Sequence, residues 1–432
     1  MASLNEIPDR LNQESVRSLF QRMYSATETE ILHQIKRYNS LATRYPGIFA
    51  ATDDIRFFST PGRIELAGNH TDHNNGCVLA SAVNIDILSA AATTSDNIVT
   101  LYSDGVADPF IIDLARLKID ENEKGTTNAL VRGIAAKFHS EGLKIGGIKA
   151  VLTSDVGIGS GLSSSAAFEV LIATIFNRFY NKGVLARLQL AQFGQFAENN
   201  FFGKPCGLMD QIACSLGGIV AIDFKKPQSP EVKRIRTDLL SGKTSILVAD
   251  TGGTHTDLTD DYAHVGNEMR MVAAYFQKQS CRELSWPEFR RKIPELRKKT
   301  GDRAVLRAMH FFQENERVRQ QMIALEKDDL TSFLNLMAES GTSSWKQVQN
   351  IFAAKCPENQ GVALGLSMTE QFLQNIPQSA CRVHGGGFAG TIIVFLPNEK
   401  VPDYQALMEP VFGPGCVQKL AVRNNGTLEV KL

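Results

Sequence analysis

Two kinds of apolar pattern follow each other along the chain. Short continuous apolar runs predict β-strands at residues 98–102, 145–152, 218–224, 245–250, 391–396 and 427–432. Apolar residues that recur every three or four positions predict helices near residues 126–141, 164–180, 260–279, 302–326 and 360–375. Strands and helices are mixed without a regular strand–helix alternation, so the pattern predicts an α+β fold.

Residues near the beginning of the chain predict the start of a helix. Thr27 and Glu30 have the spacing of a capping box, and apolar residues then recur at helical spacing until Tyr45-Pro46-Gly47, where we expect the helix to end. The residues before it predict a separate helical extension. We expect three parts, which are an N-terminal extension (1–27), an N-terminal domain (28–240) and a C-terminal domain (241–432).

Composition narrows the class of protein. The 432 residues are 43% hydrophobic, enough for sizeable cores, and carry 46 basic and 46 acidic residues. A net charge of zero gives no general attraction to nucleic acid or membranes, and no apolar run approaches the ~18–20 residues that span a bilayer. The seven cysteines are scattered and show neither a disulfide framework nor zinc-ligand spacing. We therefore expect a cytoplasmic protein with small-molecule partners and no metal–thiolate site.

A glycine- and serine-rich turn precedes the predicted helix at 164–180. Residues 157–167 read Gly-Ile-Gly-Ser-Gly-Leu-Ser-Ser-Ser-Ala-Ala. Glycines let several backbone N–H groups converge, and the helix adds its positive N-terminal end, which together suit phosphate groups. Leu162 stands where a dinucleotide-binding turn needs glycine, and Thr237 stands where a Walker A loop before Lys243 needs its first glycine. The turn indicates phosphate binding of another kind.

A second polar cluster lies between apolar segments at residues 61–76. It contains Arg63, Asn69, His70 and Asp72 around structural glycines. Such a density of donors and acceptors is unfavourable in a core, but it suits a ligand with many hydroxyl groups.

Four stretches, taken in order, resemble the galactokinases, a family of the GHMP kinases. Residues 61–76 resemble the signature Gly-Arg-(apolar)-Asn-Leu-Ile-Gly-Glu-His-Thr-Asp-Tyr-Asn, and residues 157–167 resemble the second GHMP motif, Pro-x-Gly-x-Gly-Leu-Ser-Ser-Ser-Ala. Residues 198–211 end in the family's Met-Asp-Gln triplet, and residues 384–391 resemble the glycine-rich third motif. The resemblance implies a two-domain GHMP kinase fold, with an N-terminal domain like ribosomal S5 domain 2 and a ferredoxin-like C-terminal domain.

The resemblance also implies roles for individual residues. Asp210 would be the catalytic base and Arg63 its electrostatic partner, while Ser165 and Glu198 would hold Mg²⁺. The sugar would be bound by Arg63, Asn69, His70, Asp72, Asp210 and Tyr262. The phosphates of ATP would be lined by Gly157, Gly159, Ser160, Gly161, Leu162, Ser163, Ser164, Ser165 and Ala166. The implied reaction transfers the γ-phosphoryl group of MgATP to the anomeric hydroxyl of D-galactose, and a monomer is compatible with it.

Two departures from the signature keep alternatives open. Asn69 replaces a glutamate that would bind the 6-hydroxyl of galactose, and His73 replaces a tyrosine. A sugar carboxylate about 4 Å from glutamate would be repelled by roughly 4 kcal/mol, a penalty that asparagine removes. Plant-type galacturonokinases also lack this glutamate and show His-x-Asp-His, so galacturonate is an alternative substrate. A non-catalytic sugar sensor is a second alternative. A kinase for a non-sugar alcohol is disfavoured, because the polar cluster would be left unpaired.

Overall fold

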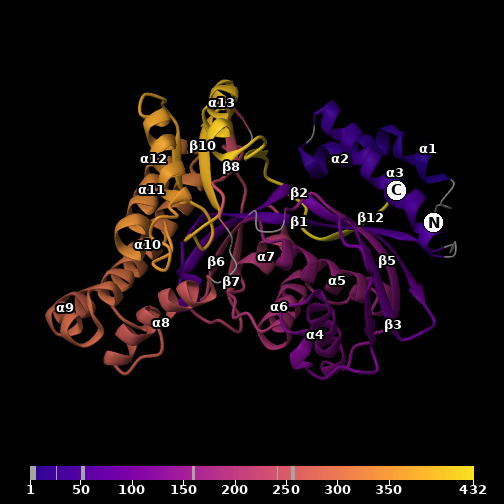
Figure 1. The fold of residues 1–432 in the computed structure, drawn as a ribbon, viewed down its shortest axis with the longest axis horizontal. Helices are drawn as coiled ribbons and strands as arrows, with labels where there is room; N and C mark the ends of the chain where they lie inside the picture. Colours follow the sequence, from indigo (N-terminus) through magenta and orange to yellow (C-terminus); the bar gives the residue numbers. More distant parts are fainter. Residues whose placement is uncertain (1–5, 26, 50–53, 158–160, 241, 254–257) are drawn as a thin grey trace.

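The structure is a computed structural model, and it describes residues 6–25, 27–49, 54–157, 161–240, 242–253 and 258–432. Within these residues the chain forms two β-sheets, each covered by helices, with the C-terminal helices at one end of the molecule and the N-terminal ones at the other (Figure 1).

The first sheet is built around two long strands, β1 (Arg56–Ala67) and β2 (Cys77–Thr94), which pair antiparallel. The strand order is β12-β1-β2-β5-β3-β4, and β6 pairs with the other end of β2 and with β7. The remaining strands are β3 (Ile98–Ser103), β4 (Phe110–Asp113), β5 (Gly147–Ser154), β6 (Ile219–Asp223), β7 (Glu231–Ile235) and β12 (Leu428–Val430). The short turn between β1 and β2 carries the polar cluster, so this hairpin positions the predicted sugar residues.

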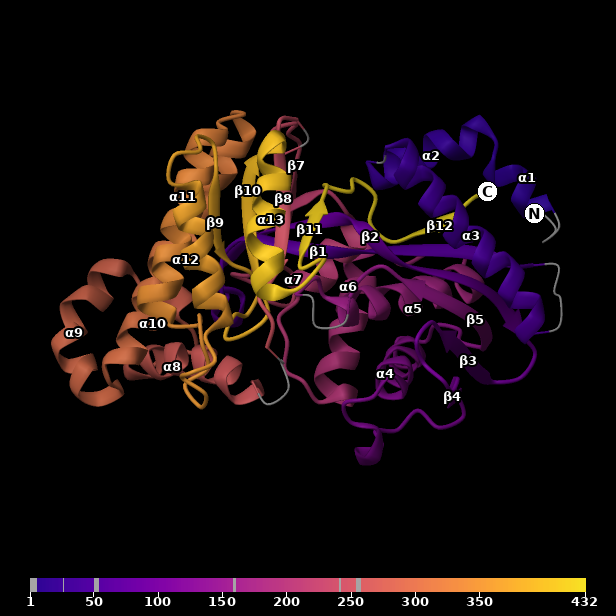
Figure 2. The same cartoon turned by 45° about the horizontal axis from the view of Figure 1, so that its top comes forward.

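Helices cover both faces of the first sheet (Figures 1 and 2). One face carries α1 (Ile7–Leu11), α2 (Glu14–Tyr24) and α3 (Glu28–Ile48); the other carries α4 (Thr127–Ser140), α5 (Ser164–Tyr180), α6 (Arg187–Ala197) and α7 (Met209–Leu216). With helices on both faces, β1 and β2 are buried almost throughout and show no alternation of buried and exposed residues.

The N-terminal layer is fastened by a buried ionic cluster. Asp86 of β2 is fully buried and binds Arg37 of α3 at 2.7 Å and Arg423 at 2.9 Å, and Tyr24 of α2 donates to it at 2.7 Å. Burial alone would raise the pKa of Asp86, but the two arginines lower it to about 2. Arg37 therefore bonds α3 to the first sheet through charged groups that need one another, and Tyr24 joins the extension to the same cluster through its hydroxyl.

The second sheet has the order β11-β8-β10-β9 and is antiparallel throughout. Its strands are β8 (Thr244–Asp250), β9 (Ala380–Val383), β10 (Thr391–Pro397) and β11 (Val417–Leu420). The helices of this half are α8 (Thr259–Tyr275), α9 (Trp286–Thr300), α10 (Asp302–Glu326), α11 (Leu330–Ser343), α12 (Gly361–Leu373) and α13 (Val401–Phe412). The longest of them, α10, also contacts β1 and β2 and so joins the two halves.

The predicted elements compare well with the observed ones. Each predicted strand and helix is present with small shifts at its ends, and the Thr27–Glu30 capping box is formed. Two details differ: α3 continues through Pro46 to Ile48, and the final strand pairs with β1 in the first sheet rather than staying with the C-terminal half. No helix in the described part of the chain is both long and apolar enough to cross a membrane.

Candidate active site

An arginine–aspartate pair lies at the centre of the candidate site. Arg63 of β1 donates to Asp210 of α7 through two parallel bonds of 2.6 Å, from Nε to Oδ1 and from Nη2 to Oδ2. The remaining terminal nitrogen of Arg63 donates to the carbonyl of Gly161, and Ser163 donates to Asp210 Oδ2. The two residues stand 147 positions apart, and the fold brings them together with the glycine–serine turn.

The carboxylate of Asp210 is held in its ionised form. Burial would raise its pKa, but the charge and hydrogen bonds of Arg63 and the hydroxyl of Ser163 lower the pKa below its usual range. Its side chain keeps 29% of its surface exposed. Oδ2 accepts two bonds within the protein and Oδ1 accepts one, so Oδ1 retains capacity for a hydroxyl group of a ligand.

The glycine–serine turn ends at the start of α5, which is long enough to carry a helix dipole. Ser163 caps the helix in the left-handed conformation (φ 58°), and Ser164 is its first residue. The first N–H groups of a helix have no partner within it, so this end suits phosphate oxygens. Gly159 and Ser160 lie outside the described residues.

The side chains of two residues in the predicted phosphate loop pack in the hydrophobic core. Leu162 and Ala166 are buried in the main hydrophobic core, so only their backbone atoms could face a nucleotide. The Leu162 carbonyl accepts the N–H of Arg63 at 3.1 Å, which ties the turn to β1.

Two oxygen atoms stand together where the sequence predicts a metal. Ser165 donates to Glu198 Oε1 at 3.4 Å, and the other carboxylate oxygen, Oε2, accepts from Gln211 at 2.9 Å. Gln211 also donates to Glu169, whose pKa burial and Glu198 raise well above its usual range. Hydroxyl and carboxylate oxygens with room for phosphate ligands fit Mg²⁺, which prefers such a set. Within the described residues no cluster of three His, Cys, Asp or Glu could hold an ion without the nucleotide.

A lysine approaches the same carboxylate. Lys204 Nζ lies 3.5 Å from Glu198 Oε1, the oxygen that also accepts from Ser165. Partial burial lowers the pKa of Lys204, but Glu198 and Asp210 more than compensate and raise it. Lys204 was not among the site residues predicted from the sequence.

The turn between β1 and β2 brings the polar cluster to the same region. Asp72 begins a short 3₁₀ turn, and its Oδ2 lies so close to Gly207 that a Cβ at 207 would stand 2.0 Å away. Asp72 therefore faces the segment that leads into Asp210. His70 donates from Nε2 to the carbonyl of Gly386 at 2.7 Å, and burial lowers its pKa to about 3, so the ring is neutral.

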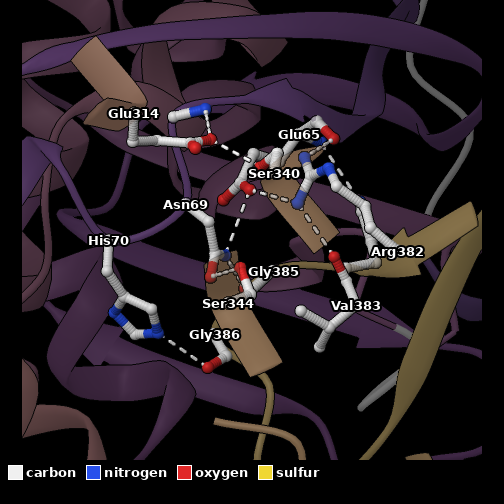
Figure 3. A network of polar contacts seen from close by, with 12 residues as sticks. Glu65, Asn69, His70, Glu314, Ser340, Ser344, Arg382, Val383, Gly385 and Gly386 are labelled. Atoms are coloured by element: carbon white, nitrogen blue, oxygen red, sulfur yellow. Dashed lines mark hydrogen bonds and ion pairs between the residues drawn. The ribbon is translucent and has the colours of Figure 1, made fainter. Parts of the chain in front are cut away.

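Asn69, which the sequence predicts as a sugar contact, has its side-chain amide bonded within the protein. Its side chain is fully buried; Nδ2 donates to Gly385 O at 2.6 Å and to Glu65 at 3.2 Å, while Oδ1 accepts from Ser344 and Asn350 (Figure 3). All four hydrogen-bonding positions of the amide are used inside the protein. Asn69 therefore joins the loop between β1 and β2 to the glycine-rich loop that follows β9.

Glu65 is a further departure from the signature, and it was not among the site residues predicted from the sequence. The family signature places asparagine where Glu65 stands and glutamate where Asn69 stands. The two residue types are exchanged, and their side chains touch. Glu65 also forms an ion pair of 2.9 Å with the fully buried Arg382 of β9 (Figure 3). Burial raises the pKa of Glu65, and Arg382 counteracts part of that rise.

Helix α10 bonds to both ends of the loop between β1 and β2. Glu314 accepts the N–H of Gly68 at 3.1 Å, Asn315 accepts that of Cys77 at 2.6 Å, and His310 donates to the backbone carbonyl of Asn69 at 2.8 Å. Burial would raise the pKa of Glu314, but neighbouring groups, His310 foremost, lower it to about 2.

The glycine-rich loop after β9 lies against Tyr262 of α8. Tyr262 of α8 donates from its hydroxyl to Gly387 O at 3.1 Å, and its ring lies against Gly386, where a Cβ would come within 2.1 Å. Burial raises the pKa of Tyr262 to about 12. Gly387 has φ 76°, so glycine is needed both for this conformation and for the close approach of neighbouring groups.

Comparisons with known proteins agree in pointing to one family. The model for "GHMP kinases N terminal domain" matches residues 129–218, and that for "Galactokinase galactose-binding signature" matches residues 43–93. The galactokinase of Clostridium tetani (strain Massachusetts / E88) is 31% identical over 369 residues, covering 84% of this chain and 89% of that protein.

Solved structures share the fold. The structure of Lactococcus lactis galactokinase complexed with galactose gives a TM-score of 0.77 at 23% identity, covering 90% of this chain and 98% of that one. Methanococcus jannaschii mevalonate kinase gives 0.60 at 15% identity, covering 85% and 98%. Both likenesses describe the fold.

Proposed function

Because the chain belongs to the galactokinase family of GHMP kinases and is an ATP-dependent sugar kinase, we propose that it phosphorylates D-galactose at the anomeric hydroxyl. The observation that carries the proposal is the Arg63–Asp210 pair, which lies beside the start of α5 and the Ser165–Glu198 oxygens. The residues proposed as base, phosphate cradle and metal donors would therefore act in one region.

The proposed chemistry follows from the charges. Asp210 is ionised, and its less occupied oxygen would accept a hydrogen bond from the attacking hydroxyl and orient it. With a lowered pKa it is a weak base, so it would take the proton late, which suits the loose transition state of phosphoryl transfer. Arg63 would keep Asp210 ionised. Mg²⁺, held by Ser165 and Glu198, would neutralise phosphate charge.

The sugar would lie against Asp72, His70 and Tyr262, with Asp210 at its anomeric carbon. Asn69 supports this site indirectly, because its amide is bonded within the protein. The argument for galacturonate needs the neutral amide of Asn69 to face the sugar, so this bonding gives galacturonate no added support. Galacturonate therefore enters the assay as a competing substrate.

Steady-state ADP release with Mg²⁺, ATP and each sugar tests the proposal. We expect turnover with D-galactose, a product that has lost its reducing end, and no turnover without sugar. Asp210→Asn should lower kcat by about a thousandfold or more while the protein still binds sugar. Binding of galactose without ADP release would identify a sensor, and preferential turnover of galacturonate would replace the proposed substrate.

A further inference from the structure

The segment between α6 and α7 places a lysine over the predicted metal ligand. Residues Glu198–Phe202 form one π-helical turn, which ends at Gly203 in the left-handed conformation (φ 86°). The N–H groups of Gly203 and Lys204 both donate to the carbonyl of Glu198, at 3.0 and 3.2 Å. The backbone thus folds back on Glu198, and the direction of Lys204 is set by this turn.

The carboxylate of Glu198 has two distinct sides. Oε2 is held from the protein interior by Gln211 at 2.9 Å. Oε1 faces Ser165 at 3.4 Å and Lys204 at 3.5 Å. A divalent ion bound by Ser165 and Glu198 would use this same oxygen, so the ammonium group and the ion compete for it.

A displaced ammonium group would remain among negative charges. Asp210 lies close enough to contribute to the electrostatics of Lys204. Ser165, in the first turn of α5, also contacts Glu198, and phosphates would bind at this end of the helix. The side chain of Lys204 is 55% exposed, so solvent reaches the ammonium group from one side.

We propose that Lys204 is a further catalytic residue. It neutralises Glu198 before the divalent ion binds, and it then contacts the terminal phosphate of the nucleotide during transfer. The assignment rests on the proposed phosphoryl transfer, since it needs a nucleotide beside Ser165. An ammonium group acts there as a mobile point charge that stabilises charge on the phosphate oxygens.

Two binding titrations without turnover test the assignment, using Lys204→Met, Lys204→Arg and, as a matched control, Lys118→Met, which removes an exposed lysine elsewhere. Removing one positive charge beside a divalent ion in a solvated site should tighten Mn²⁺ binding by about three- to tenfold, measured with a saturating unreactive ATP analogue. The affinity for that analogue at saturating Mg²⁺ should fall by about fivefold or more. Lys204→Arg and the control should stay near the wild type in both titrations.

The kinetic arm separates a catalytic role from a structural one. Lys204→Met should lower kcat by about ten- to a hundredfold with little change in the KM for sugar. Mn²⁺ affinity that is unchanged or weaker, or analogue affinity and kcat that both stay within twofold of the wild type, would overturn the assignment. Because the titrations need no turnover, they decide it even if the wild type phosphorylates no sugar, a result that would refute the proposed function alone.

Discussion

Exchanging Glu65 and Asn69 back to the order of the family signature should reveal how strongly the two positions are coupled. Glu65→Asn alone leaves the fully buried Arg382 without its counter-charge, and breaking one side of a buried pair costs about 3–5 kcal/mol. Asn69→Glu alone sets a second carboxylate beside the first. At 3.2 Å and an effective dielectric near 20, their repulsion would be about 5 kcal/mol.

Protonation limits that repulsion. Neutralising one glutamate at pH 7 costs about 3–4 kcal/mol, so the cost of Asn69→Glu stays near that value. In the double variant a single carboxylate returns to the cluster from position 69, whose side chain contacts the carboxylate that pairs with Arg382 in the wild type. The double variant should therefore be more stable than the sum of the two singles by about 3 kcal/mol or more.

Scanning calorimetry of the wild type, both single variants and the double variant measures this coupling. For a chain of this length 1 kcal/mol corresponds to about 1 °C in Tm, so the singles should lose about 3–5 °C each and the double variant about as much as one of them. Additive losses of Tm would refute the reasoning, because they would mean that the two side chains do not share Arg382.

Three other substitutions follow from the same structure. Glu314→Gln should lower the free energy of unfolding by about 3 kcal/mol at pH 7, whereas the exposed Glu316→Gln on the same helix should change little. Because the pKa of Glu314 is lowered, its contribution is complete above its unfolded pKa and disappears as pH falls towards about 2; a variant deficit as large at pH 3 as at pH 7 in urea titrations would contradict this. Gln211→Met should raise the Mg²⁺ concentration for half-maximal activity severalfold, because the predicted carboxylate ligand loses its interior bond; unchanged metal dependence would exclude this role. Gly387→Ala, which adds backbone strain and a 2.2 Å clash, should lower Tm more than Gly385→Ala, which adds the strain alone; equal losses would show that the close approach does not matter.

Helices and strands were predictable where the apolar residues follow a pattern typical of one kind of element. The helix at 302–326 buries one stripe, so its buried residues recur every three or four positions, and its predicted ends match α10. The predicted ends of the helix at 164–180 match α5, which is apolar and buried on nearly all sides. The two longest strands, β1 and β2, were not predicted as strands. They are covered by helices on both faces, so the alternation that marks a half-exposed strand is absent.

The site was predictable only in part. The residues of the Arg63–Asp210 pair were found through resemblance to known motifs, because nothing local connects positions 147 residues apart. Contacts between the two halves had no such guide. Asn69 reaches Gly385 only because α10, β1 and β9 meet, and that meeting is a property of the tertiary structure.

The exchange of Glu65 and Asn69 explains why these two loops can close directly on each other. A carboxylate at position 69 would have acceptors only and would face the carbonyl of Gly385, another acceptor. The amide of Asn69 supplies the donor that this carbonyl needs, at 2.6 Å. Because position 69 carries no carboxylate, Asp72, Asp210 and the phosphates have one negative charge fewer near them. Glu65 carries that charge instead and pairs with Arg382. The bond between the loops and the buried ion pair are therefore two results of one exchange, and a chain that keeps glutamate at position 69 must satisfy the carbonyl of its glycine loop with another donor.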